Sequence, residues 1–320
     1  MSISQRCKVS LLALSMALLA ACGGGGGAST SGTASSGGAV QPANPAQDPN
    51  APALTGNIAT DGFTWFNYRR KQAGLPQLTR NSLIDQAAQS HSDYQNKNNT
   101  VTHTETPGSP GFTGADLLTR LSAAGYVFNL AAARADGEVI AGAHDSSGFS
   151  LAESLITAIY HRFVIFEPAF KEGGSGAAVS SAGYTYFTTD YAANNGFGSG
   201  LGQGNFITYP FSNQTQVQTS FSSDLEAPDP VPNQDVVGYP ISVHTGVASR
   251  LTVQAFSLRP RGGANMNVLL LVHASDAETP QSAAAIIPLT VLGANTTYDV
   301  SFSGLIDGVA VARDWSFTTQ

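Results

Sequence analysis

The sequence changes its pattern near residue 200, and this change limits which folds the chain can adopt. Before it, residues 58–191 carry apolar side chains mainly at helical spacing, with only a few strand-like stretches. From about residue 205, short alternating runs are separated by proline and glycine turns. Helices segregated from a few strands favour an α+β domain, and the later strands favour a β-sandwich. We therefore predict one domain at 58–200 and an all-β domain at 205–320, with a glycine-rich boundary at 194–204.

Cap signals predict four helices in the first domain. Their expected starts are Thr60, Asn81 or Ser82, a capping box of Thr113 and Asp116, and a capping box of Ser150 and Glu153. The first helix should end at Gly74, the third at Gly125 and the fourth near Phe163. Strands are expected at residues 138–141, 176–180 and 184–190.

Alternation and turn signals predict the strands of the second domain. The three main signals are the alternating Leu251, Val253 and Ala255, the apolar run 268–272, which should be buried, and the alternating Tyr298, Val300 and Phe302. Asp307 and Gly308 then form a hairpin turn signal. A last alternating run, with Trp315, Phe317 and Thr319, reaches the end of the chain.

The first 22 residues predict export and lipidation. Arg6 and Lys8 precede an apolar run at 11–21 that has the length of a signal peptide. The sequence Leu-Ala-Ala-Cys-Gly at 19–23 resembles the bacterial lipobox, which implies cleavage after residue 21 and acyl chains on Cys22. The alternative is an ordinary secretory signal with an incidental Cys. Because Gly23 rather than Asp follows Cys22, the outer membrane is favoured over the inner membrane.

A tether is expected to follow the lipidated Cys22, up to residue 57. Gly, Ser, Thr, Ala and Pro dominate this segment and no apolar period occurs, so it cannot bury enough surface to fold. The mature chain has no disulfide, since Cys7 leaves with the signal and Cys22 is modified. With a net charge of −7 and no Lys/Arg cluster, nucleic acid and anionic lipid headgroups are poor partners.

Several motifs of the first domain resemble the CAP superfamily of cysteine-rich secretory, antigen-type and pathogenesis-related proteins. The matches are Asn67, Arg70, Gly74, Leu75 and Leu78 in the opening pattern, His103 with its two preceding residues, Gly-Glu-Val-Ile-Ala at 137–141, Tyr-His-Arg at 160–162 and the Phe-x-x-x-Gly-x-Gly pattern at 170–176. Val139 replaces the Asn that is usual in the family. The resemblance implies an α-β-α sandwich with a cleft above the sheet. The C-terminal part resembles the Ig-like modules appended to some bacterial relatives, most clearly in its last residues.

The resemblance also implies a polar site. Carried over, its cleft or metal ligands would be His103, Glu138 and His161, which suit zinc or another divalent cation and leave one position open. A second family Glu would fall near Ala158, which cannot serve. Glu153 is explained locally by its capping box with Ser150.

Other polar residues near these motifs have two interpretations each. Glu105 could line the cleft rim or be solvated, and Arg162 could pair with Glu167 or bind an anionic ligand, with the pairing favoured. His91 is expected in the core and His144 in solvent.

These observations favour an envelope lipoprotein whose CAP domain binds a lipid, sterol, peptide or protein. The alternative is a metal-dependent hydrolase of peptide or cell-wall material, with Glu138 as the base, although no Gly-x-Ser-x-Gly motif or triad spacing occurs. A purely structural or adhesive surface protein is the third possibility, with the Ig-like domain as spacer or adhesive module.

Overall fold

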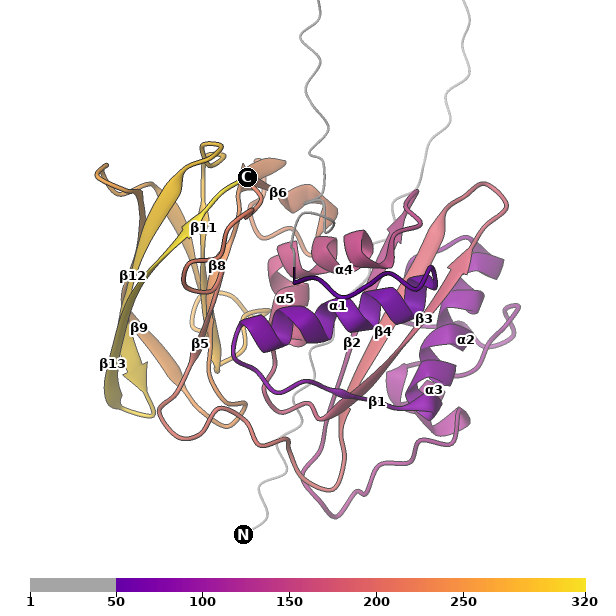
Figure 1. The fold of residues 1–320 in the computed structure, drawn as a ribbon. Helices are drawn as coiled ribbons and strands as arrows, with labels where there is room; N and C mark the ends of the chain where they lie inside the picture. Colours follow the sequence, from indigo (N-terminus) through magenta and orange to yellow (C-terminus); the bar gives the residue numbers. More distant parts are fainter. Residues whose placement is uncertain (1–49) are drawn as a thin grey trace, which may run out of the picture.

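The computed structural model describes residues 50–320 (Figure 1). The signal segment, Cys22 and most of the expected tether lie outside the described residues, so those predictions remain predictions. Among the helices of residues 50–320, none has the length and apolar composition that crossing a bilayer requires.

The first part of the chain is a three-layer sandwich, which confirms the predicted α-β-α arrangement. Its central sheet has the order β1 (Thr79–Arg80), β3 (Glu172–Val179), β4 (Thr185–Ala193) and β2 (Ala135–Ala143), and only the β1–β3 pair is parallel. One face is covered by α2 (Ser82–Asn98) and α3 (Leu117–Ala123). The other is covered by α1 (Ile58–Gln72), α4 (Gly148–Thr157) and α5 (Ile159–Ile165) (Figure 1).

Glycines on β3 let α2 approach the sheet very closely. A Cβ at Gly174 would lie 2.2 Å from the backbone nitrogen of Asp85, and one at Gly176 would lie 2.2 Å from the backbone of Gln89. No side chain fits in that space. Helix α2 therefore lies directly against the strand, and its polar side chains reach the neighbouring strand β4.

The helix starts were predicted with mixed success. Asn81 caps α2 as expected, but α1 is capped by Asn57, whose side chain accepts the backbone N–H of Thr60. In α3 the capping box joins Asp116 to Thr119, not to Thr113. Both errors arise because several Asn, Thr and Asp residues stand near each start, and local sequence alone does not choose among them.

The predicted fourth helix is two helices that meet at Ala158. The backbone of Ala158 is extended (φ −66°, ψ 118°), so α4 ends there and α5 begins. Ser147, not Ser150, caps α4. Glu153 is not a capping residue: it is 3% exposed and accepts hydrogen bonds from Trp65 Nε1 (2.6 Å) and Arg69 Nε (3.0 Å). The local explanation of Glu153 was therefore wrong.

The second part of the chain is all β, and its strands pair antiparallel. One sheet has the order β10 (Val268–Val272), β11 (Ala283–Pro288), β8 (Ile241–His244) and β5 (Ile207–Tyr209). A second has the order β13 (Val309–Thr318), β12 (Thr297–Ile306) and β9 (Leu251–Pro260), and a short pair joins β6 (Ser220–Ser222) to β7 (Val236–Gly238). A short 3₁₀ helix, η2 (Ser223–Leu225), follows β6.

Two details of the β part differ from the sequence prediction. The run 268–272 forms the edge strand β10 and is only partly buried, whereas the fully buried run is β11. In β9 the register shifts opposite Ser303 and Gly304, so the alternation that starts at Leu251 is lost and Ala255 is exposed. The hairpin is confirmed, with Asp307 and Gly308 both at positive φ between β12 and β13.

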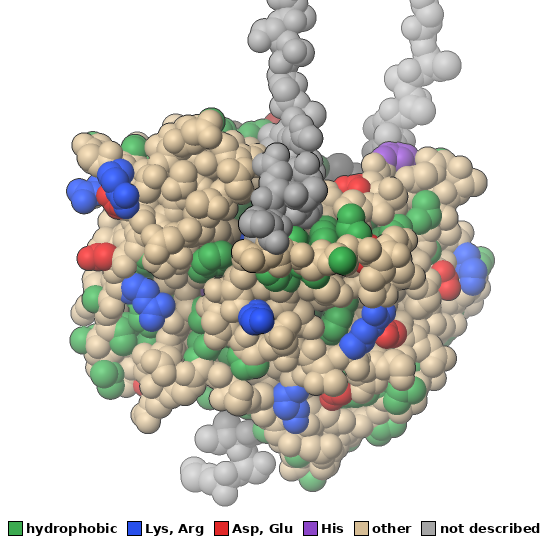
Figure 2. Space-filling model, in the orientation of Figure 1, with side chains coloured by type: hydrophobic (Ala, Val, Ile, Leu, Met, Phe, Trp, Pro, Cys, Tyr) green, Lys and Arg blue, Asp and Glu red, His purple; other side chains and the backbone are tan. Residues whose placement is uncertain are grey.

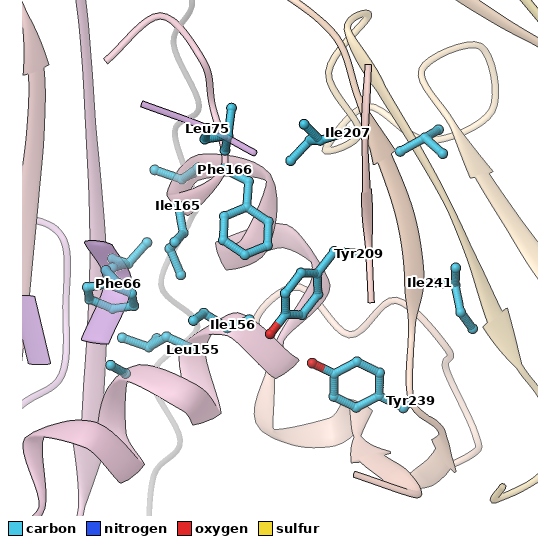
Figure 3. Packing of buried hydrophobic residues seen from close by; sticks show 14 of the residues in the cluster. Phe66, Leu75, Leu155, Ile156, Ile165, Phe166, Ile207, Tyr209, Tyr239 and Ile241 are labelled. Atoms are coloured by element: carbon cyan, nitrogen blue, oxygen red, sulfur yellow. The ribbon is translucent and has the colours of Figure 1, made fainter. Parts of the chain in front are cut away.

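The two parts share one apolar core (Figure 3). Phe166 of the first part packs against Tyr209 of the second, with ring centroids 4.7 Å apart. The guanidinium of Arg162 is fully buried at this junction: it donates to Pro240 O (2.6 Å) and lies over the rings of Tyr209 and Tyr239. The predicted pairing of Arg162 with Glu167 is wrong. Arg162 instead holds the two parts together.

A carboxylate from the second part caps a helix of the first. Glu226 follows η2 and is 3% exposed. It accepts the backbone N–H groups of Ile159 (2.9 Å), Tyr160 (2.7 Å) and His161 (3.1 Å) at the start of α5, and contacts His161 Nδ1 (3.0 Å). No side chain of the first part caps this helix. The break at Ala158 is therefore stabilised from the second part.

We expect Glu226→Gln to lower the free energy of unfolding by about 1–3 kcal/mol, because it removes the charge from a buried cap that several donors share. Thermal unfolding followed by circular dichroism measures the loss. Asp224→Asn, two residues away and exposed, is the matched control. Equal melting temperatures for the two variants would contradict the role of Glu226.

A second prediction concerns Glu167, whose pKa is raised to about 7 by burial, although the Ala169 N–H and Arg70 act in the opposite direction. Between the ordinary pKa of 4.5 and 7, the native state binds more protons than the unfolded state, so stability should fall as pH rises through this window. Glu167→Gln should remove this fall, which amounts to at most about 3 kcal/mol. Urea unfolding at pH 5 and pH 8 tests it; parallel pH profiles for parent and variant would refute it.

Candidate functional site

The two faces of the central sheet differ in chemistry. The face under α1, α4 and α5 is packed with aromatic and aliphatic side chains. Under α2 the buried layer is apolar at Ile84 and Ala87 but polar further along the helix. There, Ser92 Oγ and Gln95 Nε2 both donate to Thr188 Oγ1 on β4, at 3.1 and 3.0 Å. Because buried polar groups are costly unless paired, a polar layer of this kind marks a candidate functional site.

The centre of this layer is formed by Glu138 of β2, Arg120 of α3 and His103. One oxygen of Glu138 contacts His103 Nδ1 (2.8 Å), and the other accepts from Arg120 Nη2 (2.6 Å). Arg120 also donates from Nη1 to the backbone carbonyl of His103 (3.0 Å). Glu138 and Arg120 are buried, whereas the side chain of His103 is 23% exposed. His103 is thus the solvent-facing end of a fixed polar group.

The charge of the centre follows from its neighbours. Burial acts to raise the pKa of Glu138, but Arg120, His91 and His103 outweigh it and hold that pKa well below the ordinary value. Asp190 stands opposite Glu138 in the β2–β4 register and is fully buried. Burial and the nearby Glu138 raise the pKa of Asp190 well above its ordinary value. The neighbours therefore favour the charged form of Glu138 and the neutral form of Asp190.

A second histidine–carboxyl pair lies beside the first. His91 is fully buried, as predicted, with Nδ1 at 2.9 Å from Glu105 and Nε2 at 2.7 Å from the carbonyl of Thr102. Glu105 is 3% exposed and also accepts the backbone N–H groups of Thr113 (2.6 Å) and Gly114 (3.2 Å). Neither interpretation of Glu105 was right: it is a buried anchor of the loop, not a rim or solvated residue.

The structure brings together only two of the three ligands implied by the resemblance. His103 and Glu138 are in contact, but His161 Nδ1 is held by Glu226 of the second part. Arg162, considered for the cleft rim, is buried at the junction of the two parts. His144 is exposed, as predicted, and packs against the ring of Tyr184.

The residues present do not fit a divalent cation. Within residues 50–320, no group of three or more His, Cys, Asp or Glu side chains is placed to hold a metal ion. Both oxygens of Glu138 are already engaged, and one of them faces the positive charge of Arg120. A cation there would be repelled by the guanidinium and would not find three donor side chains placed around it, so no reaction step is assigned to a metal.

Two hollows of the described surface lie away from this centre. One, of about 400 Å³, lies along α1 and includes Phe63, Tyr68 and Lys71. The other, of about 380 Å³, lies between the end of α1 and β13 and includes Gly74 and Arg313. Neither hollow includes His103 or Glu138. The part of the polar centre that reaches solvent is the side chain of His103, which is 23% exposed.

The His103–Glu138 pair has the geometry of an oriented imidazole. With Nδ1 held by an ionised carboxylate, Nε2 on the other side of the ring can accept a proton or a hydrogen bond. A hydrolase also needs a nucleophile and an oxyanion site, and the described contacts of His103 and Glu138 include no Ser, Cys or Lys side chain. The arrangement supplies a recognition group or a base, but not a complete catalytic set.

Sequence reasoning missed Arg120 and Asp190. Arg120 was seen only as part of a helix, and Asp190 only as part of a strand. The spacing of the strands offered one usable signal, since antiparallel pairing of the predicted 138–141 and 184–190 stretches allows Asp190 to stand beside Glu138.

Comparison with known families gives one match, which lies in the first part. Residues 63–191 match the CAP family, described as the cysteine-rich secretory protein family. No curated protein sequence matches the chain.

Sixteen solved chains match, of which three are described here. An extracellular protein with an SCP domain from Bacillus anthracis is 25% identical (TM-score 0.34), and the match covers 42% of this chain and 39% of that protein. An outer surface protein from Borrelia burgdorferi is 15% identical (TM-score 0.34; 41% and 89% covered). The venom allergen-like protein 4 from Schistosoma mansoni is 11% identical (TM-score 0.30; 45% and 95% covered).

We expect Glu138→Gln to destabilise the protein by about 3–5 kcal/mol, because Arg120 would remain buried without its carboxylate. The low pKa of Glu138 implies that its contribution is present above the ordinary carboxyl pKa and is lost as pH falls. Denaturant unfolding at pH 7 and pH 3 measures both effects. A parent–variant difference that is small at pH 7, or that does not shrink in acid, would count against this account.

Proposed function

Because residues 63–191 match the CAP family, we propose that this chain acts outside the cytoplasm as a ligand-binding protein rather than as an enzyme. Its recognition centre is the His103–Glu138–Arg120 group. A lipid, sterol, peptide or protein of the cell envelope is the ligand class that the family resemblance favours.

One observation carries this proposal: both oxygens of Glu138 are engaged, by His103 and by Arg120. A carboxylate held in this way orients the imidazole and cannot also act as a free base. The exposed edge of His103 is then a fixed hydrogen-bonding group on the surface, which is what recognition of a ligand needs.

The place of action follows from the N-terminal sequence. We propose that Cys22 carries acyl chains and that the protein is anchored in the cell envelope, in the outer membrane where one exists. The basic start, the apolar run and the small residues before Cys22 support this anchor.

The anchor is tested by Cys22→Ser in the producing cell. Membrane fractions should contain the parent protein, and the variant should move to the soluble fraction. A variant that stays in membranes through extraction with sodium carbonate would overturn lipidation at Cys22 as the anchor.

Ligand binding is tested on the Cys22→Ser protein with palmitic acid, cholesterol and a muramyl dipeptide as the lipid, sterol and peptide probes, and with Zn²⁺ as a probe of the metal-binding alternative. Imidazole NMR signals and calorimetry report binding. His103→Ala should weaken binding of the active probe at least tenfold. His144→Ala is the matched control, because His144 is exposed but no carboxylate holds it in the described structure. If no probe binds, or if both variants bind equally, the centre is not the binding site.

A hydrolase is the alternative, supported by the oriented imidazole of His103. Release of product from the muramyl dipeptide by the parent, lost in His103→Ala but kept in His144→Ala, would replace the binding proposal with an enzymatic one. If Zn²⁺ binds the parent protein but not the His103→Ala variant, the conclusion that the residues around Glu138 do not fit a divalent cation is wrong.

A further inference from the structure

We propose that two loops at one end of the first part form a membrane-contact surface that inserts apolar side chains into a lipid bilayer. The surface consists of Val127, Leu130 and Phe197 and is called the apolar loop surface below. It lies where β2 begins and β4 ends, at the lower edge of the view in Figure 1. Figure 2, in the same orientation, shows hydrophobic side chains along this edge.

All three side chains are exposed to solvent. Val127 is 69% exposed, Leu130 76% and Phe197 38%. Their neighbours face the other way: Tyr126 is 5% exposed, and Phe128 packs on it with ring centroids 5.2 Å apart. The loop thus uses two aromatic rings to attach itself to the core while Val127 and Leu130 point outward.

The exposure is held in place by hydrogen bonds between the two loops. These bonds run from Asn129 N to Asn194 Oδ1 (2.9 Å), from Asn129 Nδ2 to Asn195 Oδ1 (2.8 Å), from Asn194 Nδ2 to Val127 O (2.9 Å) and from Gly196 N to Ala133 O (2.8 Å). Polar side chains therefore satisfy the backbone, and the apolar ones remain on the outside. A loop with no apolar partner would gain nothing from this arrangement.

The size of the surface favours a bilayer over a protein partner. The exposed parts of the three side chains amount to roughly 300 Å², within the range of the largest apolar patch on a monomer. A stable protein interface takes about 800 Å² from each partner. Binding to a membrane surface strengthens with the apolar area buried in it and does not need a partner surface of that size.

The charges around the surface do not favour attraction to anionic lipids. Arg134 and Lys171 flank the two loops, but Asp136 and Glu172 stand next to them, so the local charge is balanced. The chain as a whole carries −7, and Figure 2 shows basic and acidic side chains scattered over the visible face. The contact is therefore with the apolar region of neutral lipids, and salt should affect it little.

Proximity to a bilayer rests on the proposed anchor. Residues 23–49 separate Cys22 from the described structure, and these 27 residues span at most about 90 Å when extended. An anchor on such a length of chain leaves every face of the protein within reach of the membrane. The apolar loop surface would select one orientation, with the end of the sheet where β2 begins toward the lipid.

The test uses the Cys22→Ser protein, so that no acyl chain contributes, and vesicles of phosphatidylcholine and phosphatidylethanolamine. Co-sedimentation should give measurable partitioning that about 0.5 M NaCl changes less than twofold. The double variant Val127→Asp, Leu130→Asp should partition at least tenfold less. Val309→Asp is the matched control, since Val309 is 63% exposed on the β12–β13 hairpin of the second part.

A fluorescence measurement keeps the test independent of the double variant. Trp65 and Trp315 are both buried, so Leu130→Trp adds a solvent-exposed indole whose emission should shift to the blue when vesicles are added. No partitioning by the parent, no shift, or equal partitioning of the double variant would overturn the proposal. A third outcome is a parent protein that does not bind vesicles and is a dimer by light scattering, with a monomeric double variant. That outcome would assign the surface to contact with a second copy of the chain. Because these vesicles test the loops alone, failure of the Cys22 anchor would appear separately, in the cell fractionation.

Discussion

The arrangement of the two parts depends on the contacts that the buried guanidinium of Arg162 makes with the second part. Arg162 belongs to the first part, yet its shortest contact outside its own helices is the carbonyl of Pro240, and the rings beside it are Tyr209 and Tyr239. A charge in such a place is tolerable only while these partners surround it. Arg162 binds the second part, and Glu226 of the second part caps α5 of the first. The β part is therefore a structural half of the protein and not an appended spacer.

The central sheet separates two kinds of interior. On one face, aromatic packing supplies apolar burial, and on the other a polar layer joins α2 and α3 to the strands. The second arrangement is costly unless every charge has a partner, and Arg120 provides that partner for Glu138. The same pairing explains why the centre does not suit a metal ion, since a fixed cation already occupies the place beside the carboxylate.

Much of the fold could be predicted because the signals are local. The strands around Glu138 and the Asn81 cap were found from periodicity and cap chemistry, and the family resemblance supplied the layer order. The errors share a physical origin in distant contacts. The helix break at Ala158 depends on Glu226, which lies 67 residues beyond Ile159, and the burial of Glu153 depends on Trp65 and Arg69 in another helix. The spacing of apolar residues in 148–165 therefore predicts neither the helix break at Ala158 nor the partners of Glu153.

The sequence by itself determined most of the helices and several strands, where the pattern changes from α+β to β, and, through the family resemblance, that His103 and Glu138 belong to one site. The first two features depend on caps, turns and side-chain spacing within a few residues, and the third on motifs that resemble a family. Only the tertiary structure decided that His161 is held by Glu226, that Arg162 joins the two parts, and that Asp190 is buried beside Glu138. Each of these depends on partners far apart in the chain, and it is the packing of the layers, not local sequence, that selects among the pairs the sequence allows.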